Sequence, residues 1–371
     1  MKKLLSAFIV LVSVSAFATK ARLQALSNSF HLVDPQTIYG NPLDLMGMKN
    51  YISIESGSTG ATGTTDNAEG SISYGLNDHS QLAVSLGHKD DAVMGVRTAI
   101  NTQLGTTYIV PQNPIHLFYG YKTENAVYVG GVSYSNFNDK KNGAKESSST
   151  VSLGGQWGEL QVYTVTSLAN TVETGTTKFE GGGYVTVGAR YSLDTVTLGL
   201  DAYSAKAKST TVASGVEDAS ADYQALVLGL VDVRSKDGSD FFYGAQIVAS
   251  KLKNRVTSNS MSRTSLPVWF GIEAKANEWL TLRGSILQTL IVSQTKDEEG
   301  FAAGDGYLTG ANGAVSDVSG GPNNTVVAMG VGLNFKNITI DGVLKGLTGT
   351  AATQEVNQTN FMSQVGLTYN F

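Results

Sequence analysis

Hydrophobic and polar residues alternate along this 371-residue chain from about residue 50 to its end. A period of two places successive side chains on opposite faces of a β-strand. The last segment shows the pattern clearly, because its apolar positions are separated by Gln364, Gly366, Thr368 and Asn370. These apolar positions are Val365, Leu367, Tyr369 and Phe371. Such segments fit strands that have an apolar environment on one side and water on the other.

Sixteen segments of this kind are expected. They are 50–56, 69–76, 81–88, 114–122, 126–135, 148–157, 160–169, 183–193, 196–205, 222–234, 241–252, 264–275, 279–292, 325–335, 337–346 and 361–371. An even number suits an antiparallel barrel in which both chain ends lie on one side. The pattern also allows fourteen or eighteen strands.

The connections between these segments alternate between short and long. Short turns rich in Asn, Asp and Gly are expected at 77–80, 123–125, 158–159, 194–195, 236–240, 276–278 and 336, and long connections at 89–113, 206–221 and 293–324. This alternation predicts an all-β fold, a transmembrane antiparallel up-and-down β-barrel with short periplasmic turns and long extracellular loops. A soluble β-sandwich or propeller is the alternative fold.

The alternation also predicts which way each side chain points. Val187 and Leu198 should face lipid, and Thr186 and Gly199 should face the lumen. The segment 222–234 is apolar on both faces, so its register stays open.

Composition agrees with a barrel in lipid. Charged residues make up 15% of the chain, below the usual quarter, and the chain has 42 Gly, 6 Pro and no Cys. A lipid-covered wall needs few charges, and glycines suit curved, closed sheets. Without cysteine, neither a disulfide framework nor a lipid-modified cysteine is available. No basic patch indicates nucleic acid, and no cofactor is expected.

The N-terminal eighteen residues have the form of a secretory leader. A basic start precedes an apolar run, and Ala16-Phe17-Ala18 fits the A-x-A cleavage rule. We expect cleavage after Ala18, export to the outer membrane, and a net charge near −7 once Lys2 and Lys3 are removed. Residues 19–49 do not alternate. They should form a periplasmic or luminal plug, or a tail packed at the base of the barrel formed by residues 50–371.

These features together resemble Gram-negative outer-membrane porins. The segment 30–42, leading into 50–55, is similar to the N-terminal signature of major porin-like outer-membrane proteins of predatory and related bacteria, and the terminal Phe371 is similar to the signal that the barrel assembly machinery reads. The resemblance implies a channel, with outer-membrane lipid and small solutes and ions as partners. It also makes a homo-trimer one expectation, although 136–147 is too short for the constriction loop of trimeric porins.

Charges on the expected inner wall are candidates for setting ion selectivity. The pore-lining candidates are Glu55, His116, Lys122, Arg190, Asp201, Glu273, Lys275, Arg283, Asp341 and Lys345. Each of these side chains alternatively solvates the wall and pairs across strands. The loop 293–324 is expected to narrow the mouth and favour cations through Asp297, Glu298, Glu299, Asp305 and Asp317, with a disordered surface loop as the alternative.

An outer-membrane enzyme is the main functional alternative. A barrel hydrolase needs His beside Ser or Asp, and the four histidines are His31, His79, His88 and His116. None belongs to a metal-binding or nucleotide-binding motif, so no enzyme activity is expected. The sequence favours passive diffusion of small hydrophilic solutes and ions. A plugged transporter for apolar substrates and a structural or adhesive barrel remain alternatives.

Overall fold

The computed structural model describes residues 19–48, 50–57, 67–89, 93, 111–256, 258, 260–296, 323–348 and 361–371. The expected leader and the five acidic candidates of loop 293–324 lie outside these residues.

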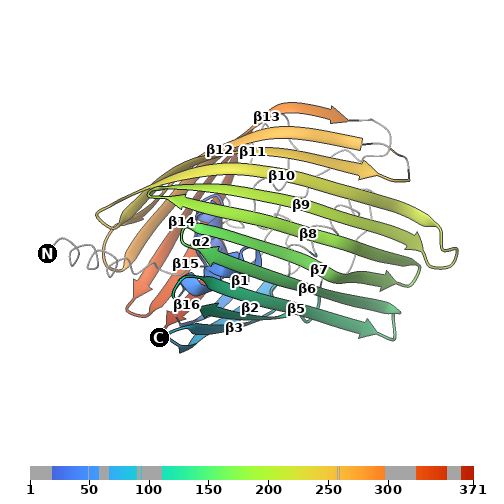
Figure 1. Ribbon diagram of the computed structural model, residues 1–371, viewed down its shortest axis with the longest axis horizontal. Coiled ribbons are helices and arrows are strands. Elements are labelled where there is room, and N and C mark those ends of the chain that lie inside the picture. Colours follow the sequence, from blue (N-terminus) through green and yellow to red (C-terminus); the bar gives the residue numbers. More distant parts are fainter. Residues whose placement is uncertain are drawn as a thin grey trace.

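Sixteen antiparallel strands form one closed barrel, as the sequence predicts (Figure 1). The strands are β1 (Tyr51–Gly57), β2 (Asn67–Asn77), β3 (Ser80–Leu86), β4 (Ile115–Lys122), β5 (Val127–Asp139), β6 (Ala144–Trp157), β7 (Leu160–Thr174), β8 (Thr177–Leu193), β9 (Val196–Thr211), β10 (Glu217–Lys236), β11 (Ser239–Asn254), β12 (Ser260–Lys275), β13 (Leu280–Lys296), β14 (Asn323–Phe335), β15 (Ile338–Thr348) and β16 (Phe361–Asn370). Each strand pairs with its neighbours in sequence, and β1 pairs with β16, where Ile54 lies opposite Leu367. Closure removes the exposed sheet edge.

One wall of the barrel is much longer than the other. Strands β7 to β13 contain 15 to 20 residues, whereas β1 and β3 contain 7. A strand of about 9–11 residues crosses a bilayer core, so the long strands continue beyond it at the end away from the termini. The expected long loop 206–221 is wrong, because β9 continues to Thr211 and β10 begins at Glu217. Inward Ala205 and Ala207 alternate with outward lysines there, which keeps the strand pattern.

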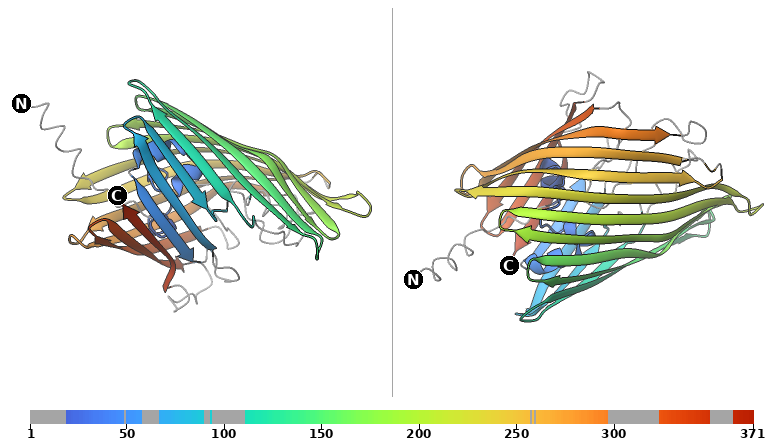
Figure 2. Two further views of the ribbon diagram at one scale, coloured as in Figure 1. Left: turned by 90° about the horizontal axis from the view of Figure 1, so that it is seen from below. Right: turned by 45° about the horizontal axis from the view of Figure 1, so that its top comes forward.

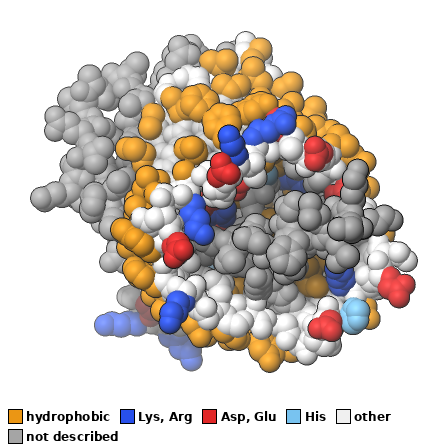
Figure 3. All heavy atoms as spheres, turned by 90° about the vertical axis from the view of Figure 1, so that its left-hand side faces the viewer, with side chains coloured by type: hydrophobic (Ala, Val, Ile, Leu, Met, Phe, Trp, Pro, Cys, Tyr) orange, Lys and Arg blue, Asp and Glu red, His pale blue; other side chains and the backbone are white. Residues whose placement is uncertain are grey.

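The outer face of the barrel is apolar. Val187 is 49% exposed and Leu198 is 41% exposed, whereas neighbouring Thr186 is buried, as the alternation predicts. The apolar residues of β16 (Val365, Leu367 and Tyr369) and the terminal Phe371 are exposed as well. Figure 3, from the end that holds the termini, shows hydrophobic side chains around the outside and charged ones nearer the centre. An apolar exterior around a more polar interior is the arrangement of a lipid-embedded barrel.

Strand β10 owes its two apolar faces to two different partners. Leu226, Leu228 and Leu230 are exposed outward, opposite the outward residues of β9 and β11. Val231 is fully buried inward, where it packs against Leu26 of the N-terminal segment. The register that the sequence leaves open is therefore fixed by packing inside the barrel.

The N-terminal segment, residues 19–48, lies inside the barrel (Figures 1 and 2). It contains the helix α2 (Lys20–Ala25) and two 3₁₀ turns, η1 (Thr37–Tyr39) and η2 (Pro42–Gly47). A search of the described residues finds no helix with the length and hydropathy that a membrane-spanning helix needs.

We expect Val187→Arg to lower the free energy of unfolding of the barrel in lipid by about 2–4 kcal/mol, because the charge would lie at mid-membrane depth. Thr171→Arg is the matched control, since Thr171 lies beyond the apolar band and opposite Glu180. Denaturant titration in lipid vesicles measures both variants. Equal stability of the two would contradict the assigned lipid face.

Candidate functional site: a segment docked across the lumen

The N-terminal segment reaches from one wall of the lumen to the opposite wall. α2 lies against β13 to β16, and η2 lies against β3 to β7. Between them, Leu26 and Leu32 pack against the inner faces of β10, β11 and β12. The segment therefore crosses the barrel interior instead of lining one side of it.

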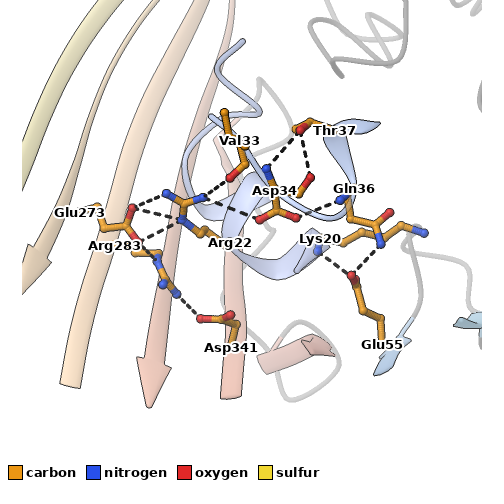
Figure 4. Close-up of polar contacts among 10 residues, drawn as sticks. All are labelled: Lys20, Arg22, Val33, Asp34, Gln36, Thr37, Glu55, Glu273, Arg283 and Asp341. Carbon is orange, nitrogen blue, oxygen red and sulfur yellow. Dashed lines mark hydrogen bonds and ion pairs between the residues drawn. The ribbon is translucent and has the colours of Figure 1, made fainter. Parts of the chain in front are cut away.

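Arg22 of α2 joins this segment to the barrel wall (Figure 4). Its Nη2 donates to Glu273 Oε2 of β12 at 2.8 Å, and its Nε donates to the same carboxylate at 3.1 Å. Arg283 of β13 donates through Nε to Glu273 Oε1 at 2.7 Å and through Nη1 to Asp341 of β15. Paired guanidinium and carboxylate groups form strong, directional hydrogen bonds, so this network links α2 to β12, β13 and β15.

Asp34 adds a fifth ionisable group to the network. Its Oδ2 lies 3.7 Å from Arg22 Nη1, and its Oδ1 accepts from the backbone N–H of Gln36 at 3.1 Å. Burial raises the pKa of Asp34 to about 7, although Arg22 and the Gln36 hydrogen bond act in the opposite direction. Burial alone would lower the pKa of Arg22, but Glu273 and Asp34 raise it above its usual value. When Asp34 is protonated, the two arginines face two carboxylates, Glu273 and Asp341, and the buried charges cancel.

Lys20 makes a second link, to β1 and β2. Its Nζ lies 2.7 Å from Glu69 Oε2, and its backbone N–H donates to Glu55 Oε2 at 2.9 Å. Gln36 Nε2 donates to both carboxylates, at 2.7 Å to Glu55 and 2.5 Å to Glu69. Lys20 at the start of the segment and Gln36 in its middle thus converge on the same pair of inward glutamates.

Phe30 is held by cation–π contact with the wall. The guanidinium of Arg190 on β8 lies 5.1 Å from the Phe30 ring centre and 5.2 Å from that of Tyr163. Arg190 Nη2 also donates to Asp201 Oδ2 at 2.8 Å, and Tyr163 donates to Asp201 Oδ1 at 2.6 Å. Such contacts add stabilisation when they are removed from water.

η2 is positioned by its first residues. Pro42 occupies the first turn, and the Asn41 side chain accepts from the Leu43 N–H at 3.2 Å, as in an N-cap. Asn41 Nδ2 donates to Gln161 Oε1 of β7 at 3.0 Å. Burial raises the pKa of Asp44 in this turn to about 7, with an opposing effect of the Thr37 hydrogen bond.

Tyr39 links η1 to β3 and to the histidines. Its hydroxyl donates to Ser85 Oγ at 2.6 Å, and its ring stacks on His88 with ring centres 3.4 Å apart. His88 Nδ1 lies 3.1 Å from Glu69 Oε2, and His116 Nε2 donates to the His88 carbonyl at 3.0 Å. These buried histidines support the docked segment.

Glycines of the inner wall allow the segment to approach closely. A Cβ on Gly154 would lie 2.7 Å from Leu43, and one on Gly229 would lie 3.0 Å from Phe30. The glycines at which a Cβ would meet the segment are Gly120, Gly154, Gly199, Gly229, Gly330 and Gly366. A larger residue at these positions would need the segment to move, so these glycines permit close approach.

The structure brings most of the pore-lining candidates into these contacts. Buried and paired with the segment or with each other are Glu55, Arg190, Asp201, Arg283 and Asp341, together with the partly buried Glu273. His116 is buried on the inner face of β4, whereas Lys122 and Lys275 are exposed at strand ends beside short turns. For Lys345 the structure describes the backbone, which pairs with Ala328. The sequence analysis missed Lys20 and Arg22. A signal for them is present, because they are two cations in a segment that does not alternate, and several acidic residues are expected on the inner wall of the barrel.

One residue of the connection between β3 and β4, Val93, lies against the inner face of the barrel. Val93 is 1% exposed. Its carbonyl accepts from Asn170 Nδ2 of β7 at 3.1 Å, and Asn170 is buried on the inner face. The prediction that loop 293–324 narrows the mouth is separate from this contact, and most of that loop lies outside the described residues.

A serine and a histidine of the N-terminal segment lie within hydrogen-bonding distance of each other. Ser29 Oγ lies 2.8 Å from His31 Nδ1, but Trp269 Nε1 donates to the same oxygen at 3.0 Å. Burial lowers the pKa of His31 to about 3, and within the described chain no carboxylate hydrogen-bonds its ring. Among the same residues, no group of three or more His, Asp or Glu side chains is placed to hold a metal ion.

Comparisons with known proteins give distant matches at the level of outer-membrane barrels. No protein-family model and no curated protein matches the chain. Among solved structures, a Pseudomonas aeruginosa FadL homologue is 12% identical with a TM-score of 0.44 and covers 93% of this chain and 96% of its own. The outer membrane channel DcaP of Acinetobacter baumannii is 11% identical with a TM-score of 0.42 (87% and 96% covered), and an anion-selective porin from Comamonas acidovorans is 12% identical with a TM-score of 0.38 (87% and 97%). TM-scores this low transfer no function to this chain.

Gly366→Ala tests the close approach of the segment to the glycines of the wall, because the new Cβ would overlap the fully buried Thr19. Alanine normally stabilises a strand relative to glycine. Faster amide hydrogen exchange in the variant would therefore come from displacement of the segment and not from a weaker strand. We expect faster amide hydrogen exchange in Lys20–Ala25. Gly284→Ala, whose Cβ would meet nothing closer than a carbonyl oxygen at 3.9 Å, should leave exchange unchanged. The same exchange rates in both variants would exclude the close approach.

Proposed function

We propose that the chain is an outer-membrane channel for passive diffusion of small hydrophilic solutes and ions. The observation that carries the proposal is the closed barrel of sixteen strands with an apolar exterior and a largely polar inner wall. Barrels of this size enclose enough space for an aqueous path. Export through a leader cleaved after Ala18, assembly by the barrel machinery and a homo-trimeric state belong to the same proposal.

The N-terminal segment controls this path. It crosses the lumen, and a cavity of about 30 Å³ remains between it and Arg190, lined also by Phe30 and Asp44. That volume holds only one or two water molecules. A solute larger than this cavity passes at this place only when the segment shifts from its docked position.

The charge pairs support a modest selectivity. Arg190 and Asp201 pair with each other, as do Arg283 and Asp341. The part of the wall that contacts the N-terminal segment therefore presents few uncompensated charges. Net negative charge in the chain then favours cations over anions. The acidic residues of loop 293–324 are part of this proposal.

A transporter for apolar substrates is the second candidate. It is favoured by an apolar cluster on the inner face of the long wall, on the side away from the termini. The cluster contains Val172, Phe179, Tyr184, Tyr203, Tyr223, Leu252 and Met261. A structural or adhesive barrel would differ from both in never conducting.

A reversible disulfide tests the channel and its control together. Ser27 Oγ of the segment lies 2.8 Å from Ser285 Oγ of β13, and the chain contains no cysteine of its own. In planar bilayers, we expect the oxidised Ser27→Cys/Ser285→Cys protein to lose the large conductance steps of the unmodified protein. Reductant should restore them, because the segment can again leave the wall.

The single variant Ser285→Cys is the control and should conduct under both conditions. Silence of the unmodified protein would reject the channel and favour the other two candidates. Steps that persist in a protein shown by mass spectrometry to be fully oxidised would reject control by the segment but keep the channel.

A further inference from the structure

The outer face of the long wall changes from apolar to basic near the far end of β9 and β11. On the outer face of β9, Leu200 and Ala202 are followed, toward the end of the strand away from the termini, by Ser204 and Lys206. On β11, Ile247 and Ala249 are followed by Lys251 and Lys253, both exposed. We refer to Lys206, Lys251 and Lys253 as the lysine patch.

The lysine patch is unpaired, whereas its basic neighbours are not. Lys208 lies 3.0 Å from Glu180, and Arg255 lies 3.5 Å from Asp222. Within the described part of the chain, no ion pair or hydrogen bond involves the side chains of the patch. Three cations are therefore available to an external partner.

The strand register places the patch in a compact area. Lys206 lies opposite Asp222 of β10, and Asp222 lies opposite Lys253. Adjacent strands are about 4.8 Å apart, so Lys206 and Lys253 have backbones roughly 10 Å apart. The next row toward the membrane contains only hydrogen-bonding side chains, which lie opposite one another in the order Ser204, Gln224, Lys251 and Ser262.

Apolar side chains continue directly below this row. Leu226, Leu228 and Ile247 are 50%, 55% and 52% exposed. The surface thus offers, in order, a face for acyl chains, a row of hydrogen-bonding groups and a group of cations. A partner that fits all three is an amphiphile with an acidic, hydroxyl-rich headgroup.

We propose that this surface binds an acidic glycolipid of the outer leaflet, with acyl chains joined to a saccharide that bears phosphate or carboxylate groups. The polar part of β9 runs from Ser204 to Thr210, roughly 20 Å along the strand. A phospholipid headgroup layer adds only about 5–8 Å on each side of a bilayer. Because barrel strands tilt by roughly 35–45°, this stretch rises about 15 Å along the membrane normal, more than a phospholipid headgroup layer covers. A larger saccharide headgroup fits this height. The inference rests on the proposed membrane location but not on conduction.

The test measures lipid binding to the folded, full-length barrel in detergent by native mass spectrometry. The probe is an acylated disaccharide with two phosphates, compared with its dephosphorylated form and with phosphatidylglycerol. We expect the variant Lys206→Gln/Lys251→Gln/Lys253→Gln to bind the phosphorylated glycolipid about 100-fold more weakly, since each lysine near an anionic lipid surface contributes roughly a factor of five. Lys140→Gln/Lys141→Gln/Lys336→Gln removes the same charge elsewhere and should bind as the unmodified protein does.

Heat-modifiable migration on gels establishes that each variant is folded before binding is compared. Equal glycolipid affinity in the patch variant and the control would overturn the proposal. The proposal would also be overturned if phosphatidylglycerol bound as tightly as the glycolipid and if the patch variant lost this binding too. That result would indicate a surface for anionic lipids in general. Retained glycolipid binding by a protein that is silent in bilayers would reject the proposed channel and leave this inference standing.

Discussion

The buried charges around Arg22 are the constraint on which the interior of this barrel depends. Glu273, Arg283 and Asp341 come from β12, β13 and β15 and are largely shielded from water. Arg22 reaches them only when α2 lies against the wall, and without it the remaining groups would carry an unbalanced negative charge. Removing one partner of a buried ion pair typically costs about 3–5 kcal/mol. The wall and the segment are therefore stable mainly in each other's presence.

Packing around that network explains features of the wall that a simple channel would not need. Phe242 and Trp269 point inward because Leu26 and Leu32 cover them. Glycines such as Gly154 and Gly229 face the lumen where side chains of the segment approach closely. The inner wall is thus partly a channel lining and partly a binding surface for residues 19–48. This dual role links the fold to the proposed control of permeation.

The sequence predicts the barrel well because strand alternation is a local property. The sixteen strands, the short turns and the outward position of Val187 and Leu198 follow from a period of two. The sequence predicts a loop at 206–211 where β9 continues, because lysines on an outer face resemble loop residues when the barrel wall extends beyond the membrane. The sequence does not predict how residues 19–48 dock, because docking depends on pairs far apart in sequence, such as Arg22 with Glu273. Alternation marks Glu273 as inward but does not identify its partner.

A double-mutant cycle between Arg22 and Glu273 tests the central claim most directly. The two single variants Arg22→Met and Glu273→Gln and their combination would be compared by amide hydrogen exchange of Lys20–Ala25 in the folded barrel. Directly interacting charges show coupling free energies of about 0.5–3 kcal/mol in such cycles. The account predicts a coupling above about 1 kcal/mol, so the double variant should expose α2 less than the sum of the two single variants does. Additive effects, or an α2 that exchanges freely in the unmodified protein, would contradict a segment held in the lumen by this network.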